Sequence, residues 1–363
     1  MLSAAVAALA LVSCNKQDTT PTTNRLKTVE IAIDNAVITK GLAGDKINQG
    51  DAVLVNDFKV FLTDAAGKVE FEAKVADGSE AAQTYWDAED LKDGALSAQF
   101  HYVDPNCTKV IAIANVGKDI TFADFLALEA LKVEEQQKQE NLVLYDEETL
   151  TAAGTQHNDV NVDGTTYVAD VYKADLVLTP RVSRFEVDGF TVKFDGEKPK
   201  YQKIKISQLA FQNYYPLTSA TTGEESGELV NHIADLTNQA SVYSWLDDSA
   251  KPEAWYRDYF DITITPADPT ADTPKALAYH MFSCNETPVL VIKLLADGQP
   301  AYLYSKGFFK MDGENPVEVT EFEEGKIYRM SAAGEVLGDG SIPIDEEDID
   351  PMDRCLEITV DVI

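Results

Sequence analysis

Residues 355–363, CLEITVDVI, alternate apolar and polar side chains with a period of two residues. A β-strand turns successive side chains to opposite faces, so the segment is predicted to be a strand with one apolar face. We name the side chains of that face the last-strand set: Leu356, Ile358, Val360 and Val362. Such a terminal strand either completes the sheet of its own domain or adds to a sheet of another copy of the chain, and the pattern leaves both open.

The same alternation occurs near the start of the chain. Residues 28–34, TVEIAID, place Val29, Ile31 and Ile33, the first-strand set, on one face. Further along, Lys109–Ala114 (KVIAIA) is an almost unbroken apolar run, which is typical of a strand buried on both faces. Other strand-like segments recur at intervals of about 8–12 residues between turn-forming residues, which favours a mainly β fold of β-sandwiches.

Two segments predict short helices within this pattern. Thr121–Gln139 places apolar side chains at helical spacing, and Ser241–Tyr259 does so more weakly because Pro252 interrupts it. Residues 341–354 are acidic and contain two prolines, which indicates an extended connector, and they lack the ligand spacing of a calcium loop.

A change of composition near Asp175 predicts a domain boundary. We expect one domain over residues 28–175, a second over residues 176–340, and the connector with the last strand over residues 341–363. A chain of 363 residues with 45% hydrophobic side chains is long and apolar enough for two buried cores.

The N-terminal residues have the pattern of a targeting signal. Small and apolar side chains fill residues 2–11, and the run Leu11-Val12-Ser13-Cys14 closes them. This arrangement is typical of a bacterial lipoprotein signal peptide, here residues 1–13, with lipid attached to Cys14. Each buried methylene of the lipid contributes about 0.8 kcal/mol, so several acyl chains make a stable anchor. Residues 14–27 are then expected to form a polar tether outside the cytoplasm.

The charge and the lack of catalytic motifs disfavour several functions. A net charge of −32 argues against nucleic acid as a partner. No catalytic, metal-binding or phosphate-binding motif is recognisable, and the histidines are widely spaced: His101, His157, His232 and His280. We therefore expect neither an enzyme nor a metal or cofactor site. The pattern leaves open whether any two of the remaining cysteines pair: Cys107, Cys284 and Cys355.

The order of these segments resembles the fimbrillins, the major fimbrial subunit family of type V pili in the Bacteroidetes. Besides the lipoprotein signal, the tether and the first strand, it rests on four segments: KVIAIANVG (109–117), LTPRVSRFEV (178–187), GKIYRM (325–330) and CLEITVDV (355–362). The resemblance covers nearly the whole chain. It implies two transthyretin-like β-sandwich domains, an outer-membrane lipoprotein exposed on the cell surface, and a role in fimbriae that support adhesion.

The resemblance also implies a mode of assembly. In shaft subunits of that family a trypsin-like protease cuts after the first strand, and the last strand of a neighbouring subunit fills the groove. In this chain, the strand removed would carry the first-strand set, and the donor strand would carry the last-strand set. The candidate cleavage residues are Lys40 and Lys46, which follow the first strand, and Arg25, which precedes it. A cut at Arg25 would release the lipid but leave the strand in place.

Two alternatives follow from these residues. The chain is either a processed shaft subunit or an unprocessed, lipid-anchored accessory subunit. A surface lipoprotein that binds glycans is the competing class, with aromatic side chains available for stacking on sugars: Trp245, Trp255, Tyr256 and Tyr259. The expected partners are other fimbrial subunits, membrane lipid through Cys14, and host or bacterial surface ligands.

Overall fold

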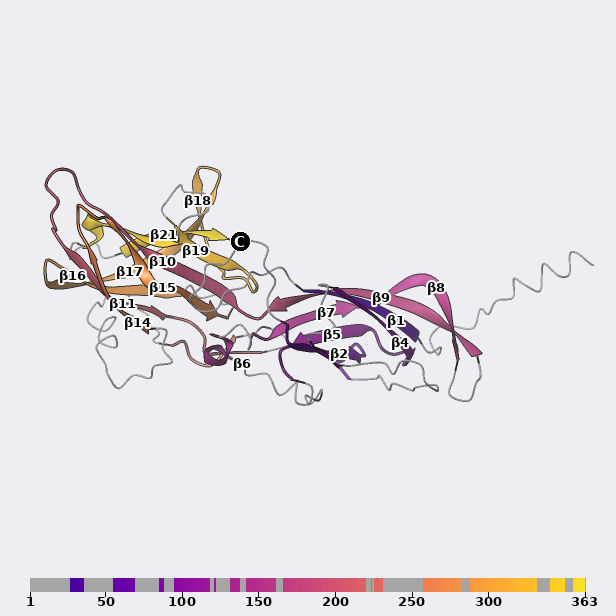
Figure 1. Cartoon of the computed structure of the whole chain (residues 1–363). Helices are drawn as coiled ribbons and strands as arrows, with labels where there is room; N and C mark the ends of the chain where they lie inside the picture. The colour runs from indigo at the N-terminus through magenta and orange to yellow at the C-terminus, as the bar shows by residue number, and fades with distance from the viewer. Residues whose placement is uncertain are drawn as a thin grey trace, which may run out of the picture. The chain divides into compact units, whose positions relative to one another are not determined.

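The structure is a computed structural model, and the account below concerns the residues that it describes (Figure 1). These are residues 27–35, 55–68, 85–87, 95–117, 121, 131–137, 142–160, 166–219, 223, 225–230, 257–282, 288–331, 340–349 and 355–362.

Strands make up most of the described chain. In the first half they are β1 (Lys27–Asn35), β2 (Asp57–Thr63), β3 (Tyr85–Asp87), β4 (Ala95–Val103), β5 (Lys109–Ala114), β6 (Leu131–Lys132), β7 (Leu144–Thr149), β8 (Thr151–Val160) and β9 (Thr166–Pro180). In the second half they are β10 (Ser183–Lys193), β11 (Ile204–Gln212), β12 (Leu217–Thr218), β13 (Glu225–Ser226), β14 (Arg257–Ile264), β15 (Thr270–Met281), β16 (Val289–Ala296), β17 (Gln299–Asp312), β18 (Asn315–Glu318), β19 (Ile327–Ser331), β20 (Ser341–Asp345) and β21 (Cys355–Val362). The predicted mainly β fold is confirmed.

The first sheet contains the first strand of the chain as an interior member. Its order is β3-β2-β5-β7-β9-β1-β4, and β8 pairs with β9 beside this path. The apolar run of β5 lies between β2 and β7, and Val110–Ala114 are buried, as its sequence predicts for a central strand.

The second sheet contains the last strand as an interior member. Its order is β14-β11-β16-β17-β21-β19-β10-β15, with β18 paired to β17 and β20 paired to β10. The two end strands, β14 and β15, are consecutive in the chain, and a tight turn between Thr265 and Asp268 joins them. The Tyr279 hydroxyl of β15 donates to the Asp258 carboxylate of β14 over 2.6 Å, so the sheet curls until its ends meet. A third, small sheet has the order β13-β12-β6.

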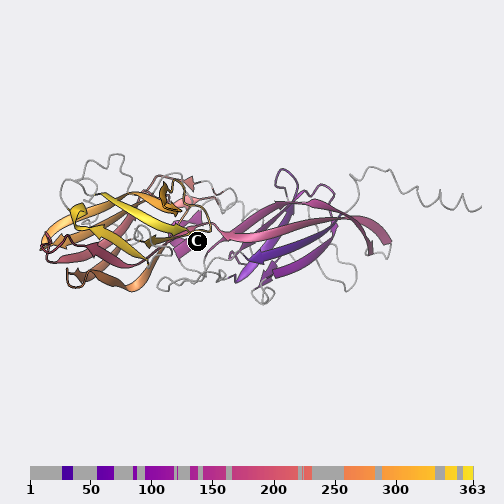
Figure 2. The same cartoon turned by 90° about the horizontal axis from the view of Figure 1, so that it is seen from above.

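The chain divides into two compact units. Unit one takes the residues up to Asp34, Lys59–Ala112 and Asp146–Leu176, and unit two takes Asn35–Phe58, Ile113–Tyr145 and Val177–Ile363. Unit two therefore includes two segments that lie early in the sequence, besides the whole chain after Leu176. In Figure 2 the yellow last strand lies among the strands of unit two.

The helix predictions are wrong where strands form, at Leu131–Lys132 and at residues 257–259, whereas Val133–Gln137 are helical as predicted, in a short 3-10 helix. Within Thr121–Gln139, Leu131–Lys132 form the short strand β6 and Val133–Gln137 form the 3-10 helix η3. Within Ser241–Tyr259, residues 257–259 begin strand β14. In both places pairing with a neighbouring strand, β12 for β6 and β11 for β14, outweighs the local helical spacing. Thr121 is in neither a helix nor a strand, and the remainder of both segments lies outside the described residues.

The acidic segment before the last strand is more regular than a connector. Ser341–Asp345 form β20, which pairs in parallel with β10, and Glu346–Ile349 form the 3-10 helix η5. The Glu346 carboxylate is buried and accepts from the backbone N–H groups of Asp195 and Lys200 at 2.8 and 3.2 Å. No helix among the described residues is both long and apolar enough to cross a membrane.

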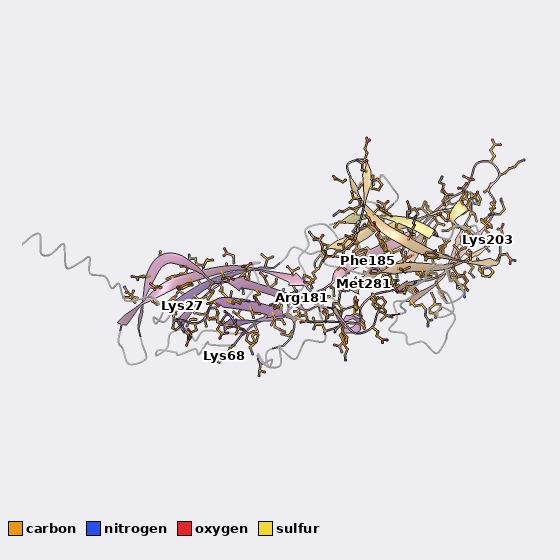
Figure 3. All side chains as sticks on the ribbon, turned by 180° about the vertical axis from the view of Figure 1, so that it is seen from behind. Lys27, Lys68, Arg181, Phe185, Lys203 and Met281 are labelled. Carbon is orange, nitrogen blue, oxygen red and sulfur yellow. The ribbon has the colours of Figure 1, made fainter. Side chains whose placement is uncertain are left out.

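Phe185 is the centre of the core of unit two (Figure 3). Its ring lies 4.6 Å from that of Phe322, 5.4 Å from that of Phe211, 5.5 Å from that of Tyr328 and 5.7 Å from that of Phe308. Aromatic pairs at these distances contribute about 0.5–1.5 kcal/mol each beyond the burial of their area. Phe185 thus joins β10 to β11, β17 and β19 across the interior.

We expect Phe185→Ala to lower the free energy of unfolding of unit two by about 3–5 kcal/mol, because the change leaves a cavity among four other rings. Urea denaturation followed by tyrosine and tryptophan fluorescence measures this loss. The control is Val317→Ala, since Val317 is 42% exposed and its loss should change stability by less than about 0.5 kcal/mol. Equal effects of the two changes would contradict the assignment of the core.

Candidate assembly site in the first and last strands

The first strand is held on both sides within unit one (Figure 1). It pairs antiparallel with β4, with Val29 opposite Phe100, Ile31 opposite Ala98 and Ile33 opposite Leu96. On its other side lies β9. The first-strand set is at most 2% exposed, so the predicted apolar face is the buried face.

The opposite face of β1 carries polar links to both neighbouring strands. The Glu30 carboxylate accepts from the Gln99 amide of β4 at 3.1 Å and pairs with the Lys173 ammonium of β9 at 2.9 Å. The hydrogen bond that Lys173 donates to Glu30 is the main cause that raises the pKa of Lys173, and the negative charge of the same carboxylate raises it further. These exposed contacts fix the position of β1 more than they stabilise it.

Lys27, at the start of β1, is buried despite its charge. Its ammonium donates to the carbonyl oxygen of Cys107 and lies 4.4 Å from the centroid of the Tyr172 ring. Burial lowers the pKa of Lys27, an effect opposed by the nearby Cys107 and Asp104. A protease that cuts after basic residues needs an accessible, extended segment, so the bond after Lys27 is protected in this state.

The last strand is also held by a strand on each side, but each half of it pairs with a different neighbour. Residues Cys355–Thr359 pair in parallel with β17, and Thr359–Val362 pair antiparallel with β19. The partner strand therefore changes at Thr359, which pairs with both Phe309 and Ser331. Three members of the last-strand set, Leu356, Ile358 and Val360, are at most 2% exposed, while Val362 is half-buried.

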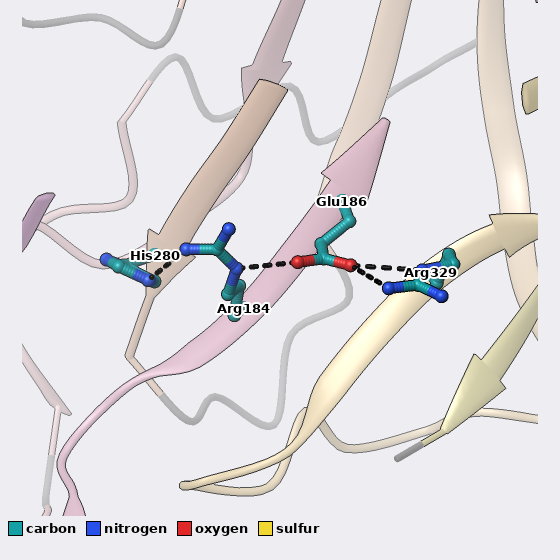
Figure 4. A network of polar contacts seen from close by, with 4 residues as sticks. All are labelled: Arg184, Glu186, His280 and Arg329. Atoms are coloured by element: carbon teal, nitrogen blue, oxygen red, sulfur yellow. Dashed lines mark hydrogen bonds and ion pairs between the residues drawn. The ribbon is translucent and has the colours of Figure 1, made fainter. Parts of the chain in front are cut away.

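A row of buried charged side chains joins β10 to β19, the strand that pairs with the end of β21 (Figure 4). The Glu186 carboxylate of β10 accepts from Arg184 Nε at 2.9 Å and from Arg329 Nε and Nη2 at 3.1 and 2.9 Å. Arg329 of β19 stands opposite Glu186 on one side and opposite Asp361 of β21 on the other. Opposite charges at directly facing positions favour this register of the three strands.

His280 links Arg184, at one end of this row, to the 3-10 helix η3. Its Nδ1 lies 2.8 Å from the carbonyl oxygen of Gln136, and its Nε2 lies 3.3 Å from Arg184 Nη1. An arginine only donates, so Nε2 must be the acceptor and Nδ1 must carry the proton. Burial lowers the pKa of His280 to about 3, and the charge of Arg184 acts in the same direction. His280 is therefore neutral at physiological pH.

The other predicted site residues fall into two groups. The residues of the first group lie outside the described part of the chain: Cys14, Arg25, Lys40, Lys46, Cys284, His232, Trp245, Trp255 and Tyr256. Lipidation at Cys14 and cleavage after a basic residue therefore stay predictions. Among the described residues, Cys107 is a buried thiol, and no group of three or more His, Cys, Asp or Glu side chains has the geometry to hold a metal ion. The buried row was not predicted, because Arg184 and Glu186 lie far in sequence from His280 and Arg329.

Comparison with known proteins gives matches among solved structures alone. No family model matches the chain, and no curated protein sequence matches it. A fimbrilin from Porphyromonas gingivalis W83 aligns with 13% identity and a TM-score of 0.48, over 94% of this chain and 98% of that one. A putative cell adhesion protein from Parabacteroides distasonis aligns with 15% identity and a TM-score of 0.48, over 94% and 97%. One from Bacteroides eggerthii aligns with 14% identity and a TM-score of 0.47, over 93% and 96%.

We expect Ile31→Asp to unfold unit one or leave it without β1, because an unpaired carboxylate would enter the apolar interior. Hydrogen exchange measured by mass spectrometry should show lost protection in β1, β4 and β9. Ala32→Asp is the matched control, since Ala32 lies on the opposite face, opposite Ser97, and should leave protection unchanged. If Ile31→Asp were equally silent, β1 would not be an interior strand.

His280 predicts a loss of stability in acid. Its pKa in the folded protein, about 3, lies below the ordinary value of 6.5, so between these values the unfolded chain binds the extra proton. The contribution of neutral His280 to the free energy of unfolding is therefore fully present above pH 6.5, and it is lost as the pH decreases toward 3. Between pH 7 and pH 5 we expect the wild type to lose about 2 kcal/mol more than His280→Gln does. Urea midpoints at both pH values provide the test, and parallel losses would refute it.

Proposed function

We propose that this chain is a structural, non-enzymatic subunit of a cell-surface fimbria, exported as a lipoprotein and polymerised by strand exchange. One observation supports the proposal most strongly. The first strand is an interior member of its sheet, and the side chains of its buried set have the same spacing and apolar type as those of the last strand. One strand can therefore take the place of the other.

Removal of β1 would open a strand-shaped site in unit one. Strands in a sheet lie about 4.8 Å apart, so β4 and β9 would be left about 10 Å apart, each with unpaired N–H and C=O groups along one edge. A new strand would restore the main-chain hydrogen bonds, and its alternating side chains would refill the interior. The last-strand set of a neighbouring subunit has the required spacing.

The first-strand set and the last-strand set gain comparable free energies from burial. Burying one Val, Leu or Ile side chain contributes about 1.5–3 kcal/mol, so three buried members of either set contribute at most about 5–9 kcal/mol. A donated β21 must first leave β17 and β19 and give up this burial in its own unit. Exchange is then driven by the empty site, because in an intact subunit β1 already occupies the place between β9 and β4.

Processing would control this exchange. A cut after Lys40 or Lys46 would separate both Cys14 and β1 from the rest of the chain, whereas a cut after Arg25 would release the lipid alone. Before processing, the subunit would be held at the outer membrane through Cys14. Afterwards its partners would be other copies or related fimbrial subunits.

The structure also favours a second role within the same class. As the chain stands, both terminal strands complete their own sheets and bury their apolar sets. A subunit that is never cut would keep this arrangement and stay on its lipid, which suits an anchor or accessory subunit at the base of the fimbria.

The proposal predicts where a trypsin-like protease acts first. Treatment of the protein without its signal peptide should cut between Asn35 and Val55 before Lys27, Arg181 or Arg184, since these three side chains are buried. Mass spectrometry identifies the cut, and gel electrophoresis in mild detergent detects polymers. Loss of β1 with a product that stays monomeric would rule out the shaft role. Cleavage confined to Arg25 would favour the anchor.

A synthetic peptide of residues 355–363 tests the donor strand without altering the subunit. We expect it to bind the cleaved protein, to stop polymer growth, and to have no effect on uncut protein. A peptide with Asp at positions 358 and 360 is the control and should do neither, because charges would enter the apolar site. Inhibition by both peptides, or by neither, would contradict donation by the last strand.

A further inference from the structure

The first and last strands match each other residue by residue, beyond their shared apolar spacing. Residues 29–34 read VEIAID and residues 356–361 read LEITVD. Glutamate, isoleucine and aspartate occupy the same three positions in both segments, and the other positions pair valine with leucine, alanine with threonine and isoleucine with valine. A strand with one apolar face needs only alternation of apolar and polar side chains, so the match of the acidic residues requires a separate explanation.

The matching apolar positions fill equal volumes. The first-strand set has one valine and two isoleucines, and β21 has leucine, isoleucine and valine at the same positions, so the total number of side-chain carbons is equal. Relative to β1, the sequence of β21 adds one carbon opposite Phe100 and removes one opposite Leu96. A packed core tolerates volume-conserving changes of this kind best. Where β1 has an alanine opposite Ser97, β21 has Thr359, and a threonine facing a serine is a favourable pair.

The matching glutamate of β1 is the residue that links this strand to its neighbours on both sides. Glu30 accepts from the Gln99 amide of β4 at 3.1 Å and pairs with the Lys173 ammonium of β9 at 2.9 Å. Strands β4 and β9 are also the two strands that would flank the site opened by removal of β1 (Figure 1). A strand that enters this site with a carboxylate at the place of Glu30 would therefore restore both links.

In its own sheet the corresponding glutamate of β21 makes a longer and more exposed contact. The Glu357 carboxylate lies 3.8 Å from Lys306 Nζ, and the Glu357 side chain is 67% exposed. Exposed ion pairs contribute little to stability, so this contact does little to hold β21 in unit two. The contacts within the described part of unit two thus do not explain why β21 has a glutamate at this position.

We propose that Glu357 sets the alignment in which β21 of one subunit enters unit one of the next, by taking the place of Glu30. This inference rests on the strand exchange proposed above, and it adds the direction and the register of the donor strand. The donor would run antiparallel to β4, as β1 does. Its Glu357 carboxylate would accept from Gln99 and pair with Lys173.

The apolar alternation alone leaves several alignments open. A shift by one residue would turn the last-strand set toward solvent, but a shift by two residues would keep it in the interior. The reversed direction also alternates, and it would place Asp361 instead of Glu357 at the position of Glu30. Reversal would, however, pair the donor in parallel with β4, whose edge pairs antiparallel with β1. An exposed ion pair adds little affinity, but it can favour one of several alignments whose apolar contacts are similar.

The alignment is tested first in the uncut chain, where no exchange is needed. The full mature chain with Val29→Leu, Ala32→Thr and Ile33→Val has the sequence of β21 at the positions of β1. We expect this variant to keep the urea midpoint of the wild type and its hydrogen-exchange protection in β1, β4 and β9. Loss of protection in these strands would overturn the proposal, because the donor sequence would then not fit the site in this alignment.

The contact between Glu357 and Lys173 is tested by exchanging the two charges. Synthetic peptides of residues 355–363 are titrated, at low ionic strength, into protein from which cleavage has removed β1, and fluorescence anisotropy measures binding. The Glu357→Lys peptide should bind the wild-type protein roughly fivefold more weakly than the wild-type peptide does, because like charges would replace an ion pair. Lys173→Glu in the protein should weaken the wild-type peptide by a similar factor, and the two changes together should restore binding. Lys173 is exposed, and circular dichroism verifies that the variant folds.

An Asp361→Lys peptide is the matched control, because it makes the same change of charge at the other acidic position. In the proposed alignment that position lies opposite Ala95, so Lys173→Glu should not rescue this peptide. Rescue of Asp361→Lys in place of Glu357→Lys would indicate the reversed direction and overturn the proposal. Binding of the wild-type peptide without the charge dependence would contradict the alignment alone, whereas failure of that peptide to bind would contradict strand donation and this inference with it.

Discussion

The pairing of the two terminal strands inside their sheets is the constraint on which the rest of the structure depends. A strand within a sheet must match neighbours on both edges and bury one face, so β1 and β21 cannot shift by one residue without exposing their apolar sets. Each of these strands is an interior member of its sheet, so each unit is complete only while that strand is in place.

Unit two combines this constraint with two kinds of internal contact. On one face of the sheet the ring of Phe185 packs against four other aromatic rings. On the other face Glu186 lies between two arginines, and His280 extends the row to η3. Removing one partner of these buried charges would leave another buried and unpaired, which is strongly destabilising.

Strand exchange would use main-chain edges and apolar sets that are buried in the single subunit, so a protease would be needed to expose them.

The sequence by itself determined the mainly β fold and the buried faces of β1, β5 and β21, because the period-two alternation and the apolar run are local signals. It gave the wrong structure at Leu131–Lys132 and at residues 257–259, where pairing with distant strands outweighs helical spacing. Only the tertiary structure decided that β21 lies between β17 and β19, and it alone brought Arg184 and Glu186 together with His280 and Arg329. The reason is physical: a side chain's spacing along a strand is set locally, but its partners on neighbouring strands are set by the order of the sheet.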